Sequence, residues 1–238
     1  MADLKYKRVL LKISGESLAP ESGVGIDPVA AELIAKQIKD VYALGADIGI
    51  VIGGGNLWRG KIGVAVGMDQ ATADNVGMIA TVMNSLVLMD ALEKQGVTTR
   101  VQSAIEMRQV AEPVILRRAL RHLEKKRVVI FGGGTGNPFC TTDTAGAQRA
   151  IEINADVMIK ATKVDGIFDS DPKKNPNAKK YDEIRCMDAL SKSLGVMDAT
   201  ALSMCMEYHL PLIVLNLWEP GALCKALLGE KVGTLVIP

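Results

Sequence analysis

Short runs of β-branched and other apolar residues recur along the whole chain, and most of them are continuously apolar rather than alternating. A strand of this kind is covered on both faces, as in a parallel sheet that lies between helices. This pattern constrains the fold more than any other feature of the sequence. We predict strands at 8–13, 47–52, 97–101, 128–131, 156–160, 212–215 and 234–237.

Helical patterns separate these strands. Asp27 followed by Pro28 is typical of a helix start, because Asp caps free N–H groups and Pro fits the first turn. Further helices are predicted at about 69–93, 114–126 and 143–154. The alternation favours a three-layer α/β/α sandwich with a mostly parallel central sheet, formed by residues 1–238 as a single domain. The long polar connection 169–180 is either a solvated loop or a flap over a nucleotide.

Composition disfavours several other classes of protein. The net charge of +1 gives no general attraction for nucleic acid or for an anionic membrane. No apolar run approaches the ~20 residues of a membrane span, and the N-terminus lacks a signal-peptide pattern, so we expect a cytoplasmic protein. The four cysteines form no CxxC pair and the two histidines lie far apart, so no metal-binding cluster is predicted. Cys140 is interpreted as a small packing residue.

Three of the predicted strands end in loops that contain glycine. These loops begin at Lys12, Gly53 and Gly132. Ligands of a parallel α/β sheet bind outside the carboxyl ends of the strands, and glycine lets backbone N–H groups approach an anion closely. The loops therefore predict a groove suited to phosphates, including those of two nucleotides at once. Neither GxxxxGK[ST] nor GxGxxG is present, which disfavours the usual nucleoside triphosphatase and dehydrogenase sites.

The same loops resemble those of a known family. Lys12-Ile-Ser-Gly15, the Gly-Gly-Gly-Asn at 53–56 and the block Thr-Lys-Val-Asp-Gly-Ile-Phe-x-x-Asp-Pro at 162–172 resemble the amino-acid-kinase family. The segment Gly134 to Asp143 is similar to the uridylate-binding segment of the bacterial UMP kinases in that family. The resemblance extends from residue 7 to 238. It implies transfer of the γ-phosphoryl group of ATP to UMP, which gives UDP and ADP for pyrimidine nucleotide biosynthesis.

The resemblance also implies catalytic and ATP-binding residues. Lys12 would neutralise charge on the transferring phosphoryl group, and Lys163 would contact the β- and γ-phosphates. Asp143 and Asp198 would lie near the metal or the catalytic lysine, although Asp143 is also placed as a helix N-cap would be. The residues expected on the ATP side are Lys12, Ile13, Ser14, Gly15, Gly55, Arg59, Thr162, Phe168 and Asp171. Mg²⁺ is expected to bind mainly through nucleotide phosphates, with no protein cage.

A second set of residues is implied on the UMP side: Gly54, Asp74, Thr135, Gly136, Asn137, Pro138, Phe139, Cys140, Thr141 and Thr142. Asn137 would contact the uracil edge, since an amide both donates and accepts hydrogen bonds. Asp74 would accept from ribose hydroxyls or orient Arg59, or else it is an ordinary acid in the first turn of a helix. Cys140 stands where the family pattern leads us to expect an aromatic residue.

Relatives of this type are hexamers that GTP often activates and UTP inhibits, so the resemblance implies a homohexamer with an effector site. Weaker matches assign that site to Pro20, Glu21, Ser22, Gly23, Val24, Gly25, Arg100 and Arg127. Two alternatives stay open. One is a kinase of the same family with an acyl or carbamoyl acceptor, against which the segment 137–143 argues. The other is a non-catalytic nucleotide sensor or storage protein, against which the joint presence of Lys12, Arg59 and Asp198 argues, by the resemblance.

Overall fold

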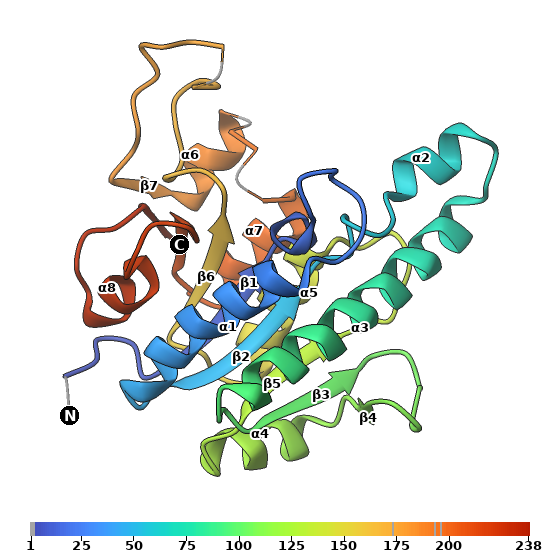
Figure 1. The fold of residues 1–238 in the computed structure, drawn as a ribbon. Coiled ribbons are helices and arrows are strands. Elements are labelled where there is room, and N and C mark those ends of the chain that lie inside the picture. The colour runs from blue at the N-terminus through green and yellow to red at the C-terminus, as the bar shows by residue number, and fades with distance from the viewer. Residues whose placement is uncertain (1–2, 173, 193, 196) are drawn as a thin grey trace.

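The computed structural model describes residues 3–172, 174–192, 194–195 and 197–238. Within them, a nine-stranded sheet lies between two layers of helices, as predicted (Figure 1). The order across the sheet is β4-β3-β5-β2-β1-β6-β8-β9-β7, and every neighbouring pair is parallel except β8 and β9. The strands are β1 (Arg8–Ile13), β2 (Asp47–Ile52), β3 (Thr99–Ser103), β4 (Glu112–Pro113), β5 (Val128–Gly132), β6 (Val157–Thr162), β7 (Glu183–Arg185), β8 (Leu212–Asn216) and β9 (Thr234–Ile237).

The helices divide between the two faces of the sheet. α1, α3 and α8 pack on one face, and α4, α5, α6 and α7 pack on the other. The short α2 packs against α3 and projects beyond the body of the fold (Figure 1). The helices are η1 (Gly15–Leu18, a 3₁₀ helix), α1 (Pro28–Ala43), α2 (Gly60–Ala65), α3 (Gln70–Lys94), α4 (Leu116–Glu124), α5 (Thr142–Glu152), α6 (Cys186–Ser191), α7 (Ala199–Glu207) and α8 (Ala222–Leu228).

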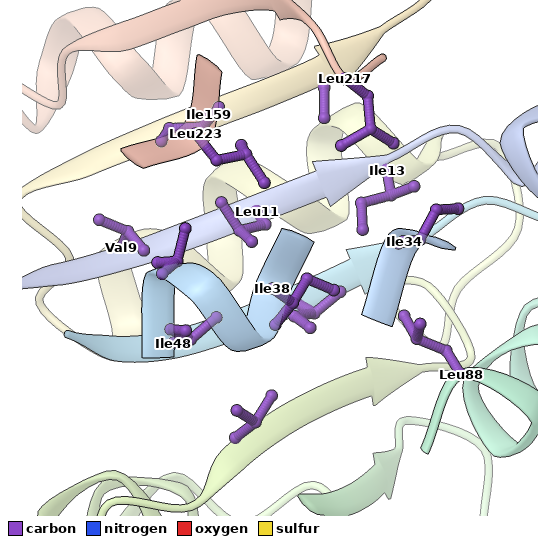
Figure 2. Packing of buried hydrophobic residues seen from close by; sticks show 14 of the residues in the cluster. Val9, Leu11, Ile13, Ile34, Ile38, Ile48, Leu88, Ile159, Leu217 and Leu223 are labelled. Atoms are coloured by element: carbon purple, nitrogen blue, oxygen red, sulfur yellow. The ribbon is translucent and has the colours of Figure 1, made fainter. Parts of the chain in front are cut away.

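The central strand β1 is buried on both faces. Val9, Leu11 and Ile13 point into the cluster beneath α1 (Figure 2), whereas Leu10 points into the cluster beneath α5. All four side chains are completely buried. Burying one such side chain contributes roughly 1.5–3 kcal/mol to folding. The burial of β1 therefore strongly stabilises the centre of the sheet.

Two predicted elements are shifted in the structure, each for a local reason. The strand predicted at 97–101 begins at Thr99, because Val97 instead closes the end of α3. The Val97 N–H donates to the Leu92 carbonyl, and Gly96 has a φ of +82°, as in a Schellman motif. The helix predicted at 114–126 begins only at Leu116, because Glu112–Pro113 forms the edge strand β4.

By length and composition alone, α3 also meets the requirements for a membrane span, although no long apolar run marks it in the sequence. Half of the relevant window is buried inside the structure. Core helices of soluble proteins pass the same test, so this is weak evidence for a membrane location.

Asp69 caps α3 and Asp27 caps α1, the latter as predicted.

The connections that leave β1 and β6 cover opposite faces of the sheet. After β1 the chain forms α1 on one face, whereas the chain after β6 reaches α6 and α7 on the other. Because β1 and β6 are neighbours, a crevice forms between their carboxyl ends. Such a topological switch point is where ligands of open α/β sheets bind.

Candidate active site

Two lysines contact one carboxylate at this switch point. Lys12 on β1 and Lys160 on β6 are register partners in the parallel pair. The Lys12 Nζ lies 2.7 Å from Oδ1 of Asp143, and the Lys160 Nζ lies 2.7 Å from its Oδ2. We call these three residues the Lys–Asp–Lys cluster. It gathers two cations and one anion at the carboxyl edge of the sheet.

A glycine lets Asp143 reach this position. Gly146 lies one turn after Asp143 on α5, and a Cβ atom there would lie 2.5 Å from Cε of Met158 and 3.4 Å from Cγ of Lys12. Because glycine has no Cβ, α5 can lie close to β1 and β6. Residues three apart share a helix face, so Asp143 is directed at the same two strands.

The charges in the cluster affect one another. Burial opposes ionisation of Asp143, but the ammonium groups of Lys12 and Lys160 outweigh it, so the pKa of Asp143 is lowered from its ordinary value of 3.8. Burial lowers the pKa of Lys160 from 10.5 despite the attraction of Asp143, and repulsion from Lys12 acts in the same direction as burial. Asp143 is therefore the carboxylate that both partly desolvated ammonium groups contact, and Asp198 also attracts Lys160.

The start of α5 is fixed by Thr141, so the interpretation of Asp143 as the N-cap is wrong. The Thr141 hydroxyl accepts from the N–H groups of Asp143 and Thr144 at 3.0 and 3.4 Å. Asp198, the N-cap of α7, in turn accepts from the hydroxyls of Thr141 and Thr144 and from the Ala201 N–H. The helix N-terminus adds a positive dipole end beside the Lys–Asp–Lys cluster.

A cavity of about 490 Å³ opens on the β6 side of the cluster. Lys160 lines it together with Thr162, Phe168 and Asp171, so three residues expected on the ATP side meet here. Phe168 and Lys180 form an isolated antiparallel bridge at the base of the 169–180 connection. The described part of this connection projects from the fold (Figure 1), and Asp171 and Pro172 line the cavity. The start of this connection therefore borders the cavity, and the flap over a nucleotide stays a prediction.

A second cavity, of about 380 Å³, lies on the β2 side. Gly54, Asp74, Cys140, Thr141 and Thr142 line it, as expected for the UMP side, and Gly55, which was expected on the ATP side, lines it too. Thr142 directly precedes Asp143, so the cluster lies where the two cavities approach each other. Cys140 is exposed, and its interpretation as a packing residue is wrong. Trp58, Lys61 and Gln70 also line this cavity and were not predicted.

Asp74 holds the segment from Gly134 to Asp143, which resembles the uridylate-binding segment of the family. Its Oδ2 accepts from the N–H of Phe139 at 2.9 Å, and Phe139 has a φ of +65° and a largely exposed ring. Arg59 instead forms an ion pair with Glu16 at 2.6 Å. Asp74 therefore does not orient Arg59 in this structure. Among the described residues, those that line the second cavity do not include Thr135, Gly136, Asn137, Pro138 or Phe139.

Known proteins resemble this chain in sequence and in fold. The sequence model of the amino acid kinase family matches residues 7–216. The chain belongs to the amino acid kinase family. Its fold is similar to that of the UMP kinase from Bacillus anthracis, with 44% identity over 98% of this chain and 96% of that one and a TM-score of 0.95. The UMP kinase from Ureaplasma parvum is 39% identical over 98% and 100% of the two chains, with a TM-score of 0.92. The uridylate kinase from Archaeoglobus fulgidus is 30% identical over 96% and 99%, with a TM-score of 0.73.

Three further residues were assigned to the site from the family resemblance: Ile13, Ser14 and Lys163. Ile13 is completely buried, so only its backbone faces the loops, and the Ser14 hydroxyl accepts from the Glu16 N–H. Lys163 is exposed and lies outside the lining of both cavities.

The residues assigned to the effector site do not gather in one place on this chain. The Gly25 N–H donates a hydrogen bond to the Asn56 carbonyl, near the carboxyl ends of β1 and β2. Arg100, paired with Glu93 at 3.2 Å, lies at the start of β3, and Arg127 directly precedes β5. Because β3 and β5 run parallel to β1 and β2, these arginines lie at the opposite edge of the sheet from 20–25.

Lys160 is the main residue that the sequence analysis missed. The signal was a lysine in an otherwise apolar strand, the same feature that marks Lys12 on β1. Its meaning depends on the β1–β6 register, which joins residues 148 positions apart and leaves no local trace in the sequence.

Proposed function

We propose that this protein is a UMP kinase, a single-domain nucleoside monophosphate kinase that converts ATP and UMP to ADP and UDP in pyrimidine nucleotide biosynthesis. The observation that carries the proposal is the Lys–Asp–Lys cluster beside two cavities, one lined by three of the residues expected on the ATP side and one lined by five of those expected on the UMP side. The family match and the similarity to UMP kinases over nearly the whole chain support it.

The reaction needs positioning and charge neutralisation more than covalent help. An oxygen of the UMP phosphate forms a bond to the γ-phosphorus as the bond between that phosphorus and the β–γ bridging oxygen breaks. The second pKa of a phosphate monoester is about 6, so the acceptor is largely ionised at neutral pH and needs no general base. We assign Lys12 to the transferring phosphoryl group and Lys160, which lines the ATP-side cavity, to the ATP phosphates. Asp143 holds both ammonium groups in place.

Mg²⁺ is the cation that we expect with ATP. The residues that the structure describes contain no cluster of three or more potential ligands, and both oxygens of Asp143 contact lysines. Both oxygens of Asp198 likewise accept hydrogen bonds from threonine hydroxyls, so we expect the cation to bind mainly through phosphates and waters. When bound, Mg²⁺ would neutralise charge on the ATP phosphates.

The substrate assignment predicts a clear order of activities. ADP release should be fast with UMP, slower with CMP, and at background with acetylglutamate, aspartate or carbamate. A coupled ADP-release assay across these acceptors measures the order directly. Turnover of an acid or of CMP without turnover of UMP would contradict the proposal and favour the acyl- or carbamoyl-acceptor alternative. Nucleotide binding without any turnover would favour the sensor alternative.

Asp74 offers a test of the UMP side alone. Asp74→Asn weakens the acceptor of the Phe139 N–H and removes a carboxylate from the cavity. We expect the KM for UMP to rise about 10-fold, because hydrogen bonds to charged groups contribute roughly 1.5–3 kcal/mol, while the KM for ATP stays within about twofold. Asp90→Asn on the same helix, whose partner is the exposed Lys94, is the matched control. An unchanged KM for UMP would refute this role of Asp74.

We further propose that the enzyme is a cytoplasmic homohexamer regulated by GTP and UTP. Exposed apolar side chains on α3, including Ile79 and Met83, support a subunit contact there. The separation of segment 20–25 from Arg100 and Arg127 is compatible with effector contacts contributed by different subunits. Light scattering tests the hexamer, and steady-state ADP release with and without GTP or UTP tests the regulation.

A further inference from the structure

Two buried asparagines form a reciprocal pair beneath the glycine loops. Asn56 follows β2 and Asn84 lies in the middle of α3, and only 1% and 0% of their surfaces are exposed. Nδ2 of Asn56 donates to Oδ1 of Asn84 at 3.1 Å, and Nδ2 of Asn84 donates to Oδ1 of Asn56 at 2.7 Å. Burying two amides is costly unless their polar groups are satisfied, so this pair calls for an explanation beyond packing.

The second N–H of each amide reaches a backbone carbonyl. Nδ2 of Asn84 donates to the carbonyl of Gly53 at 2.7 Å, and Nδ2 of Asn56 donates to that of Gly25 at 2.8 Å. The Gly25 N–H returns a bond to the Asn56 carbonyl at 2.9 Å. All four side-chain N–H bonds are therefore used. The pair joins the loop after β2 to α3 and to segment 20–25.

The loop after β1 rests on the same pair. A Cβ atom at Gly15 would lie 2.4 Å from the carbonyl oxygen of Gly53 and 2.6 Å from Oδ1 of Asn56. The Gly53 N–H also donates to the carbonyl of Ile13 at 2.9 Å. Two of the three glycine loops are thus seated on one another and on the amide pair.

The pair fixes the direction of the backbone donors. In a trans peptide the C=O and the following N–H point in opposite directions. Because the Gly53 carbonyl is bound by Asn84 inside the fold, the Gly54 N–H points away from α3. The Gly54 carbonyl accepts from the N–H groups of Leu57 and Trp58, which fixes the Gly55 N–H in the same manner. Both glycines line the β2-side cavity.

We propose that Asn56 and Asn84 are positioning residues for phosphoryl transfer, which keep the Gly53 carbonyl turned inward and the N–H group of Gly54 directed at the phosphates. The inference rests on the proposed function, because the phosphates concerned are those of UMP and ATP. A carbonyl oxygen turned toward them would replace attraction by repulsion.

The test compares Asn84→Ala with Ser85→Ala. Ser85 is the adjacent residue on α3, is equally buried, and donates its hydroxyl bond only to the Thr81 carbonyl at 2.7 Å. We expect kcat/KM for UMP to fall at least 10-fold in Asn84→Ala and less than twofold in Ser85→Ala, at a temperature where both variants are folded. Asn84→Asp, which keeps the volume but sets a carboxylate against the Gly53 carbonyl, should be equally impaired.

Hydrogen exchange separates positioning from general destabilisation. Without nucleotide, the amides of residues 53–56 should exchange faster in Asn84→Ala than in wild type, with no change in Ser85→Ala. Asn56→Ala should also speed cleavage at the exposed Glu21 by a glutamate-specific protease, because Gly25 loses its side-chain donor. Equal kcat/KM in the two α3 variants, or equal exchange at 53–56, would overturn the inference. A wild-type protein that failed to phosphorylate UMP would overturn the proposed function instead. The exchange measurement would still show whether the asparagine pair orders residues 53–56, because it is made without nucleotide.

Discussion

Replacing Lys12 by alanine is expected to abolish phosphoryl transfer while leaving nucleotide binding largely intact. Lys12 brings an ammonium group to the switch point, 2.7 Å from Asp143, where charge develops on the transferring phosphoryl group. Removing one preorganised donor from a transition-state site costs about 10²–10³ in kcat. We therefore expect at least that loss in steady-state turnover, with ATP affinity by calorimetry changed only a few-fold, since the β6-side cavity is untouched.

Two further variants make this result interpretable. Lys12→Met keeps the aliphatic stem that packs near Gly146, so a loss equal to that of Lys12→Ala would exclude a packing defect. Lys39→Ala removes an exposed lysine of α1 and should leave kcat unchanged. Turnover of Lys12→Ala within a few-fold of wild type would show that Lys12 does not neutralise the transferring group.

The fold was largely predictable because a strand that is buried on both faces has a composition of its own. β1, β2, β5 and β8 follow from their apolar runs, and α1 follows from its predicted cap at Asp27. α3 was predicted as a long helix, but Ile79 and Met83 of its apolar pattern are exposed in the structure. The helices α2, α6 and α8, each of six or seven residues, were not predicted, and neither were the nine-residue α7 and the short strands β4 and β7. A helix of six or seven residues is not stable alone, so tertiary packing decides its position and the local sequence carries little signal.

The candidate site was predictable only where it is made of contiguous loops. Lys12 and Gly54 lie in motifs that can be read locally, whereas the contact between Lys160 and Asp143 depends on strand register and on the approach of α5. The same limit applies to Asn84. An asparagine in the middle of a helix has no pattern that connects it to a glycine loop 31 residues earlier.

The second large effect is expected on stability when Asp143 is replaced by asparagine. The variant keeps the shape of the side chain but leaves the ammonium groups of Lys12 and Lys160, 11% and 16% exposed, without their shared counter-ion. Breaking a buried pair by removing one partner costs about 3–5 kcal/mol, so we expect a loss near the lower end in urea unfolding at neutral pH. Asp47→Asn is the matched control: Asp47 is 14% exposed and also contacts two cations, but Lys126 is 58% exposed and water can solvate it.

The pH dependence distinguishes the cluster from an ordinary surface pair. Because the folded pKa of Asp143 lies below 3.8, its contribution is present above that pH and is lost as the pH falls through the folded value. In Asp143→Asn the acid-side slope should therefore be smaller. The pKa of Lys160 is already lowered from 10.5 in the wild type, and loss of the carboxylate should lower it further. The unfolded chain then binds more protons than the folded one as the pH rises toward 10.5, so the variant should regain stability on the alkaline side. A difference in unfolding free energy that stays constant from acid to alkaline pH, or that matches Asp47→Asn, would mean that the three charges do not act as one cluster.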